Sequence, residues 1–288
     1  MTQNDQQVPW TDEQWARVNQ VIQEEARRAR VAATFLPLYG PLPPSTDFVR
    51  EETISVGPPL SIADRTTIQL PTLQVKVNVR GAQLADPEMT SVLALFRRAA
   101  NLLARLEDAM IFNGQPGPNL PPTASPLSIW EVRGGQAWEG LVRPASPAVT
   151  VTIPPPAAAP FPGPGQLLVA GISEAIGILE AGGHFGPFAV ALDQNLFLTA
   201  QTPDTNSLVL PQDRVIPFLG GGPLVRSTTL PAKSGVVVAL GGAPVELVVA
   251  TDVSLGFLQI TTDPKFVFRV FEKIALRIKQ ADAIVRLV

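Results

Sequence analysis

Proline is the residue that most constrains the fold of this chain, because 30 of its 288 residues are proline. Proline has no backbone N–H to donate and fits a helix only in the first turn. Long helices are therefore confined to a few proline-free windows. Even the longest uncharged stretch, from Pro144 to Ser173, contains eight prolines up to Pro164 and offers no membrane-spanning helix.

Three windows predict helices, at residues 11–33, 87–113 and 165–183. In the first window, Thr11 is a candidate N-cap for an apolar stripe that either packs on its own domain or lines a docking groove. The second window would give a spine of about 40 Å that ends at Gly114. The stripe of the first window is Trp15, Val18, Ile22, Ala26, Ala29 and Ala33.

Strands are expected in most of the remaining chain. Residues 72–80 alternate apolar and polar side chains, which places Leu73, Val75, Val77 and Val79 on one face. The run at 47–56 could pair with this strand across "GPPLS" to form a long arm with little core. Further strands are expected within 188–192, 235–242, 245–258 and 265–288, so the fold class is α+β.

Composition excludes several function classes. The net charge of −3 does not favour nucleic-acid binding, and the absence of cysteine excludes disulfides and thiolate chemistry. The N-terminus has neither the basic nor the apolar region of a secretory signal. A cytoplasmic protein that does not enter a membrane is the expectation.

No enzymatic constellation is found, and we therefore predict no catalytic residue, metal site or cofactor. There is no phosphate-binding loop, and "GGGP" at 220–223 leads into apolar residues rather than a helix. One histidine is too few for a two-histidine metal site. The adjacent pairs Glu24–Glu25, Glu51–Glu52 and Glu107–Asp108 are interpreted as solvated faces, because neighbouring side chains point apart.

His184 lies in "EAGGHFGPFAVAL" and is the only histidine. A lone histidine beside glycines suits a catalytic base, but it also suits a turn that enters a strand. No acidic residue lies close in sequence to orient its ring. We therefore favour the turn.

The arm and the proline-rich stretches are extended segments with little support of their own. Isolated hairpins are marginally stable in water. Neighbouring copies would complete such segments, which favours a large assembly over a monomeric enzyme.

Several segments in this order resemble the encapsulins, bacterial and archaeal shell proteins that share the tailed-phage major-capsid fold. They are "LYGPL", "LARLEDAMIFNG", "GGHFGPFAVAL", "DVSLGF" and the closing "EKIALRIKQADAIVRLV". The similarity extends from about Trp10 to Val288. Residues 115–139 depart from it as an insertion after the spine.

The resemblance implies a division of the chain into P-domain, E-loop and A-domain. A pore loop would include Thr202, Asp204, Thr205, Asn206 and Ser207. The expected ranges are 1–47 for the N-terminal helix and groove segment of the P-domain, 48–81 for the E-loop, 82–187 for the P-domain with its spine, 188–250 for the A-domain and 251–288 for strands that return to the P-domain.

The resemblance also implies a groove on the inner wall that binds the C-terminal targeting peptide of a cargo protein. Replacing Ile22 and Leu36 with aspartate is then expected to reduce cargo loading without breaking the cage. The groove would comprise Trp15, Val18, Ile22, Ala26, Phe35, Leu36, Leu38 and Tyr39, with Asp252, Val253 and Leu255 opposite.

The implied function is an icosahedral homo-oligomeric shell, of 60 copies or a multiple, around a peroxidase or a ferritin-like iron-oxidising enzyme. The smallest icosahedron is the weakly favoured size. Two alternatives stay open at this point. One is a phage or prophage major capsid protein of the same fold, and the other is a soluble hydrolase with an unrecognised site.

Overall fold

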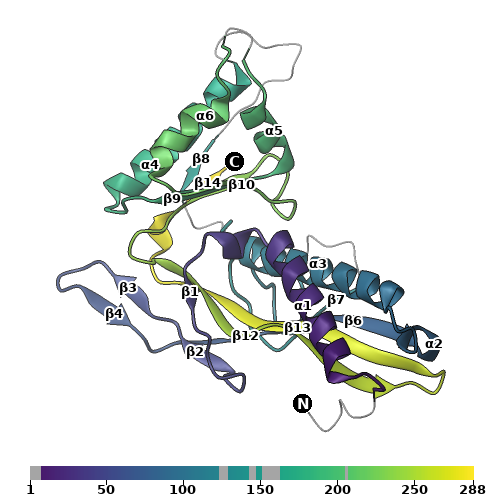
Figure 1. Ribbon diagram of the computed structural model, residues 1–288. Helices are drawn as coiled ribbons and strands as arrows, with labels where there is room; N and C mark the ends of the chain where they lie inside the picture. Colours follow the sequence, from purple (N-terminus) through teal and green to yellow (C-terminus); the bar gives the residue numbers. More distant parts are fainter. Residues whose placement is uncertain (1–7, 123–128, 143–146, 151–162, 205–206) are drawn as a thin grey trace.

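The computed structural model describes residues 8–122, 129–142, 147–150, 163–204 and 207–288. This part of the chain forms two lobes, each built on a five-stranded sheet with helices packed against it (Figure 1). The expected α+β fold class is confirmed.

The sheet of the first lobe has the strand order β1-β12-β13-β6-β7, and β1 is its only parallel member. Leu73, Val75, Val77 and Val79 are all buried on one face, as the alternation predicted. The strands are β1 (Leu38–Tyr39), β6 (Thr72–Arg80), β7 (Trp130–Arg133), β12 (Val245–Ile260) and β13 (Lys265–Ile278).

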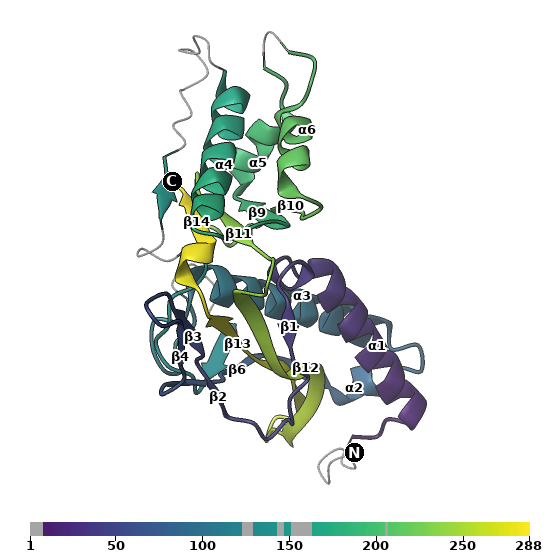
Figure 2. The same ribbon diagram turned by 90° about the vertical axis from the view of Figure 1, so that its left-hand side faces the viewer.

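Helices α1 and α3 cover this buried face, as Figure 2 shows from the side. Thr11 caps α1 as predicted, in a reciprocal capping box with Gln14. The first helix ends four residues before the predicted boundary, because Arg30 is extended (ψ 138°). The helical segments of this lobe are α1 (Asp12–Ala29), η2 (Ala32–Thr34), α2 (Gly81–Leu84) and α3 (Thr90–Asn113).

An aromatic cluster lies in this core where the start of α1 meets α3 and β13. The Trp10 ring stacks on Phe268 with centroids 5.0 Å apart, and Trp15 and Phe96 meet the same pair edge-on. Such geometry adds to the apolar area that these rings bury. It fixes the start of α1 against the sheet.

The second lobe has the strand order β10-β9-β11-β14-β8 and its own apolar core. The side chains of Leu168, Ile172 and Leu179 on α4 pack into this core. The strands are β8 (Ala148–Val149), β9 (Phe188–Leu192), β10 (Leu224–Arg226), β11 (Gly235–Ala239) and β14 (Ile284–Leu287). The helical segments are α4 (Pro164–Ala181), α5 (Gln194–Gln201), α6 (Pro211–Val215) and η4 (Ile216–Leu219).

The lobes divide the chain differently from the expected ranges. Helix α4 was placed within 82–187 with the spine, but it packs in the core of the second lobe. Strand β14 was expected to return to the first sheet at the end of 251–288, but it pairs with β11 in the second. The short helix η5 (Ala281–Ala283) carries the chain from β13 across to β14.

The arm, which we define as residues 48–69, differs from the predicted hairpin. Its outer part pairs β3 (Thr53–Ser55) with β4 (Ser61–Ala63), and its base pairs β2 (Phe48–Arg50) with β5 (Thr67–Gln69). Strand β6 belongs to the main sheet instead, because its apolar face is needed against α3. Val56, Leu60 and Ile62 remain exposed on the arm.

The insertion at 115–139 is built onto the first sheet. Its strand β7 pairs with β6 and buries Trp130 and Val132. The Gln115 amide group lies buried, donates to the Gly117 and Gly134 carbonyls and accepts from the Trp138 ring N–H. The segment therefore widens the sheet by one strand.

Candidate functional site

A cavity of about 440 Å³ opens where the end of α1 meets the sheet of the first lobe. Apolar side chains from β1, β12 and β13 form one wall, and charged side chains form the other. The residues that line it are Arg27, Arg30, Ala33, Thr34, Leu38, Gly40, Pro41, Glu107, Leu247, Val249, Asp252 and Ile274.

Two backbone features shape this cavity. Asp108 accepts hydrogen bonds from the backbone N–H groups of Val31 (3.0 Å) and Ala32 (2.8 Å), which turns the chain out of α1. Gly40 has a φ of +135°, and a Cβ there would lie 2.5 Å from the Val249 carbonyl oxygen. Only glycine allows this approach, which holds β1 beside β12.

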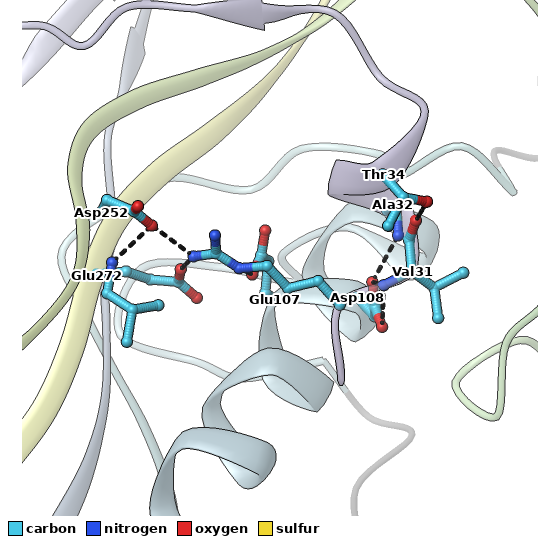
Figure 3. A network of polar contacts seen from close by, with 9 residues as sticks. Val31, Ala32, Thr34, Glu107, Asp108, Asp252 and Glu272 are labelled. Carbon is cyan, nitrogen blue, oxygen red and sulfur yellow. Dashed lines mark hydrogen bonds and ion pairs between the residues drawn. The ribbon is translucent and has the colours of Figure 1, made fainter. Parts of the chain in front are cut away.

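Arg30 forms the charged wall by contacting three carboxylates from three different elements. Figure 3 labels these carboxylates, Glu107, Asp252 and Glu272. Its Nε donates to Glu107 on α3 at 2.6 Å. Its Nη2 donates to Asp252 on β12 and Glu272 on β13, each at 2.8 Å. The Glu107 and Glu272 side chains are 1% and 0% exposed, whereas Asp252 is 67% exposed at the mouth.

Burial of so many acids raises their pKa values. Burial is the largest cause for Glu272, whose pKa rises to about 7 although Arg30 opposes the shift. Asp108 also has a pKa raised to about 7 by burial, against its two backbone donors. The pKa of Glu107 lies well above its usual value, through burial and then repulsion by Glu272. Burial lowers the pKa of Arg30, but the attraction of Glu272, Glu107 and Asp252 outweighs burial, so its pKa is raised overall.

Most residues of the predicted groove are buried in the structure. The stripe of α1 faces α3 and the sheet, and its side chains are core residues rather than an open surface. Aspartate at Ile22 or Leu36 would therefore place a charge in the core and unfold the lobe, contrary to the expectation from sequence. The predicted groove residues that are buried are Trp15, Val18, Ile22, Ala26, Phe35, Leu36 and Val253.

Two predicted residues do line the cavity. Leu38 belongs to the apolar wall of the cavity and is 64% exposed, and Asp252 lies at the mouth of the cavity. Tyr39 follows Leu38 on β1 and its ring stacks on the guanidinium of Arg277 at 4.0 Å. Leu255 is half-buried and packs against the main core.

Sequence reasoning missed Arg30 and Glu272 and misread Glu107 and Asp108, which are buried rather than solvated. An available signal was the apolar character of the second half of α3. Because side chains there are buried around most of the helix, an acidic pair must face protein in both directions.

The described residues of the predicted pore loop, Thr202, Asp204 and Ser207, lie between α5 and α6 in the second lobe. Asp204 accepts a hydrogen bond from the backbone N–H of Gly165 (3.0 Å), at the start of α4. Thr202 follows α5, and the Ser207 N–H donates to the Asp204 carbonyl at 2.9 Å. Thr205 and Asn206 lie outside the described residues.

His184 has a carboxylate nearby after all. Its Nε2 lies 3.1 Å from Oδ1 of Asp282 in η5, without hydrogen-bond geometry. No local pattern indicated this partner, because it is almost a hundred positions away. The contact joins the turn after α4 to the crossover between the sheets. Within the described ranges, no group of three metal-ligating side chains is found and no helix is long and apolar enough to cross a membrane.

Comparison with known proteins gives concordant results. The Linocin_M18 family model, described as an encapsulating protein for peroxidase, matches residues 1–120 and 151–275. The Type 1 encapsulin shell protein EncA of Myxococcus xanthus is 29% identical over 294 residues, which cover 96% of this chain and 92% of that protein.

Solved structures share the fold at lower identity. A virus-like particle from Pyrococcus furiosus matches with a TM-score of 0.67 and 16% identity, over 96% of this chain and 100% of that one. The capsid of Myoviridae phage XM1 matches with a TM-score of 0.56 and 12% identity, over 88% of each chain. The expected major-capsid-like fold is confirmed.

Proposed function

Because this chain belongs to the Linocin_M18 family and is thus an encapsulin shell protein rather than an enzyme, we propose that its shell encloses a cargo enzyme held by a C-terminal docking peptide. Copies of the chain assemble with one another into a capsid-like shell, as its homologues do. The proposed cargo is a peroxidase or a ferritin-like iron-oxidising protein. The proposed place of the shell is the cytoplasm, and its proposed size is 60 copies or a multiple, with the smallest icosahedron favoured.

The proposal assigns a role to each part of the molecule. The first lobe is the P-domain, the second lobe is the A-domain and the arm is the E-loop. The segment with Thr202, Asp204 and Ser207 contributes to a pore where A-domains meet. These assignments replace the expected ranges with the lobes described above.

The cavity beside α1 is the observation that carries the proposed docking. Its wall of Leu38, Leu247, Val249 and Ile274 is apolar, and Leu38 is exposed in the single chain. Leu247 and Ile274 are already buried, so an extended peptide with leucine-like side chains would cover the exposed Leu38 and the half-buried Val249. Because many copies line one shell, weak individual contacts would together retain the cargo.

The phage capsid alternative shares the fold, so the fold does not separate the two. The separating observation is the sequence match, which is to an encapsulating family model over most of the chain. It favours a shell around protein cargo over a container for DNA.

Co-expression with a peroxidase that carries its own C-terminal tail tests the proposal. The peroxidase should sediment with hollow particles, and a tailless version should not. Leu38→Asp should reduce the sedimenting activity roughly tenfold while particles still form, because it places a charge on the apolar wall. Leu95→Asp, an exposed leucine on α3 outside the cavity, is the matched control and should load normally. Equal loading of the tailless enzyme, or of the Leu38 variant, would contradict the docking site.

A further inference from the structure

The two arginines that line the cavity, Arg27 and Arg30, are bound very differently. Arg30 contacts the carboxylates of Glu107, Asp252 and Glu272. Arg27 is exposed, and within the described ranges its side chain has neither an ion pair nor a hydrogen bond. The acids that line the cavity, Glu107 and Asp252, are both bound to Arg30. The cavity therefore has an accessible cation at its edge that no acid of the described chain neutralises.

The position of Arg27 on α1 places it on the same side of the helix as Arg30. The two residues are three positions apart, and residues at this spacing are neighbours on one face of a helix. Arg28 follows about 100° further around the helix, is exposed and does not line the cavity. Glu24, one turn before Arg27, accepts a hydrogen bond from Gln20 at 2.8 Å instead. The free cation thus lies on the flank of α1 that borders the cavity.

The helix dipole explains only part of this arrangement. A cation in the last turn of a helix interacts favourably with the carbonyl groups at that end. Arg27 and Arg28 both lie in the last turn of α1, and Arg28 supplies this interaction from the solvent side. The dipole therefore accounts for a basic residue at the end of α1, but it does not account for one beside the cavity.

Covering the apolar wall would remove water from around Arg27. Leu38 on β1 is exposed, and it borders the same cavity as Arg27. A segment that covers Leu38 would displace water between the two walls. A charged group that loses its water costs free energy unless an opposite charge takes the place of the water. Because the lining acids are bound to Arg30, the bound segment is the source of that charge.

On the basis of the proposed function, we propose that the docking segment carries an aspartate or glutamate side chain beside its leucine-like residues, and that this carboxylate pairs with Arg27. The apolar residues of the segment then cover Leu38 and Val249, while Arg30 keeps its own carboxylates. Arg27 is a specificity-determining residue of the docking site, because it favours acidic segments over neutral ones and repels basic ones.

A competition between two surrogate cargo proteins tests the inference on the assembled shell. A green and a red fluorescent protein are co-expressed with the full-length chain, and each ends in a tail of leucines spaced by glycine and serine. The tails differ at one position, which is glutamate in one and glutamine in the other. The ratio of green to red in sedimented particles, divided by the ratio in the lysate, gives the preference. We expect a preference of about fivefold for glutamate, the upper range of an exposed ion pair. In a second competition, glutamine should be preferred over lysine.

Variants of α1 complete the test. Arg27→Gln should bring the ratio close to one, and Arg27→Glu should favour the lysine tail over the glutamate tail. Arg28→Gln is the matched control, because it removes the same charge from the same turn outside the cavity, and it should keep the preference. Both arginines are exposed, so the variants should still fold and form particles.

The outcomes separate this inference from the proposed function. Equal loading of the glutamate and glutamine tails by the unaltered chain would overturn the inference and leave the docking site intact. A preference that survives Arg27→Gln, or that Arg28→Gln also removes, would overturn the assignment to Arg27. If neither tail loads better than a tailless protein, the docking site itself is wrong, and the inference fails with it.

Discussion

Asp108 holds the end of α1 in place through two backbone hydrogen bonds, although it is buried without a direct cation of its own. Asp108→Ala would leave the N–H groups of Val31 and Ala32 without their acceptor. The expected loss of unfolding free energy is about 2–4 kcal/mol, from one buried and one partly buried donor left unsatisfied. Denaturant unfolding of the full chain measures it. Asp108→Asn keeps one acceptor oxygen and should lose less, so equal losses would contradict this reasoning.

The acidic cluster should also make stability depend on pH. Glu272 has a pKa raised from 4.5 to about 7 in the folded protein. Between these values the folded chain holds a proton that the unfolded chain releases, so stability should fall as pH rises through this window. One such group contributes up to about 1.4 kcal/mol per pH unit. Glu272→Gln should flatten the dependence of the unfolding midpoint between pH 5 and pH 7, and an unchanged slope would contradict the assignment.

At the residue scale, local sequence patterns could identify a helix cap, but they could not identify contacts between residues that are far apart in the chain. The Thr11 cap was predictable because its partner lies three residues away. Arg30 and Glu272 are 242 positions apart, and only the packing of α1 on the sheet brings them together. The same is true of His184 and Asp282. Local patterns carry no information on such distant pairs.

At the scale of elements, the arm is tied to the first sheet by a buried arginine, by further polar contacts and by Ile68, which is buried in one cluster with Val248 and Ala275. Arg277 on β13 donates to Glu246 and lies 3.4 Å from Glu52 at the base of the arm. The Lys279 carbonyl accepts from the backbone N–H of Ile54 at 2.8 Å, and Lys273 pairs with Asp47. These contacts set the direction in which the exposed arm leaves the lobe.

Arg277→Met should loosen the arm without unfolding the sheet, because Lys279 still neutralises Glu246. We expect faster hydrogen exchange in residues 48–69 and fewer assembled particles. Mass spectrometry of exchange and size-exclusion chromatography measure the two effects. Lys265→Met is the matched control, a basic residue at the other end of β13 whose partner Asp263 is exposed. Exchange in the arm equal to that of the control would show that Arg277 does not anchor it.

The elements themselves were largely predictable, whereas the partners of the strands were not. The face of β6 followed from its alternation, and Gly114 ended the spine where predicted. The arm was paired with β6 in the prediction because the two segments are adjacent in sequence. In the structure β6 pairs with β13, which lies almost two hundred residues later. Strand pairing depends on burial of a whole face, which adjacency does not reveal.

At the scale of the whole molecule, we expect that the insertion can be removed without loss of the fold. Residues 121–150 fall outside the family match, and Gln115 and Trp138 exchange two backbone hydrogen bonds of 2.9 and 3.0 Å at its base. Residues 116–137 could therefore be replaced by an Asn-Gly turn, which closes an antiparallel pair.

The shortened chain should fold and assemble with reduced stability. It loses the burial of Trp130 and Val132, worth about 2 kcal/mol each. Thermal unfolding and negative-stain microscopy give the two readouts. Loss of particles with a folded chain would show instead that the insertion forms an interface between copies.

Tyr39 gives the shell a built-in optical reporter. It is the only tyrosine in the chain, it is partly exposed, and it lies between Leu38 and Gly40, both of which line the cavity. Nitration would thus attach a single chromophore per subunit, at Tyr39. Under the proposed function, a peptide that enters the cavity would change the surroundings of this chromophore, and the absorbance of an intact particle would then report how many cavities are occupied.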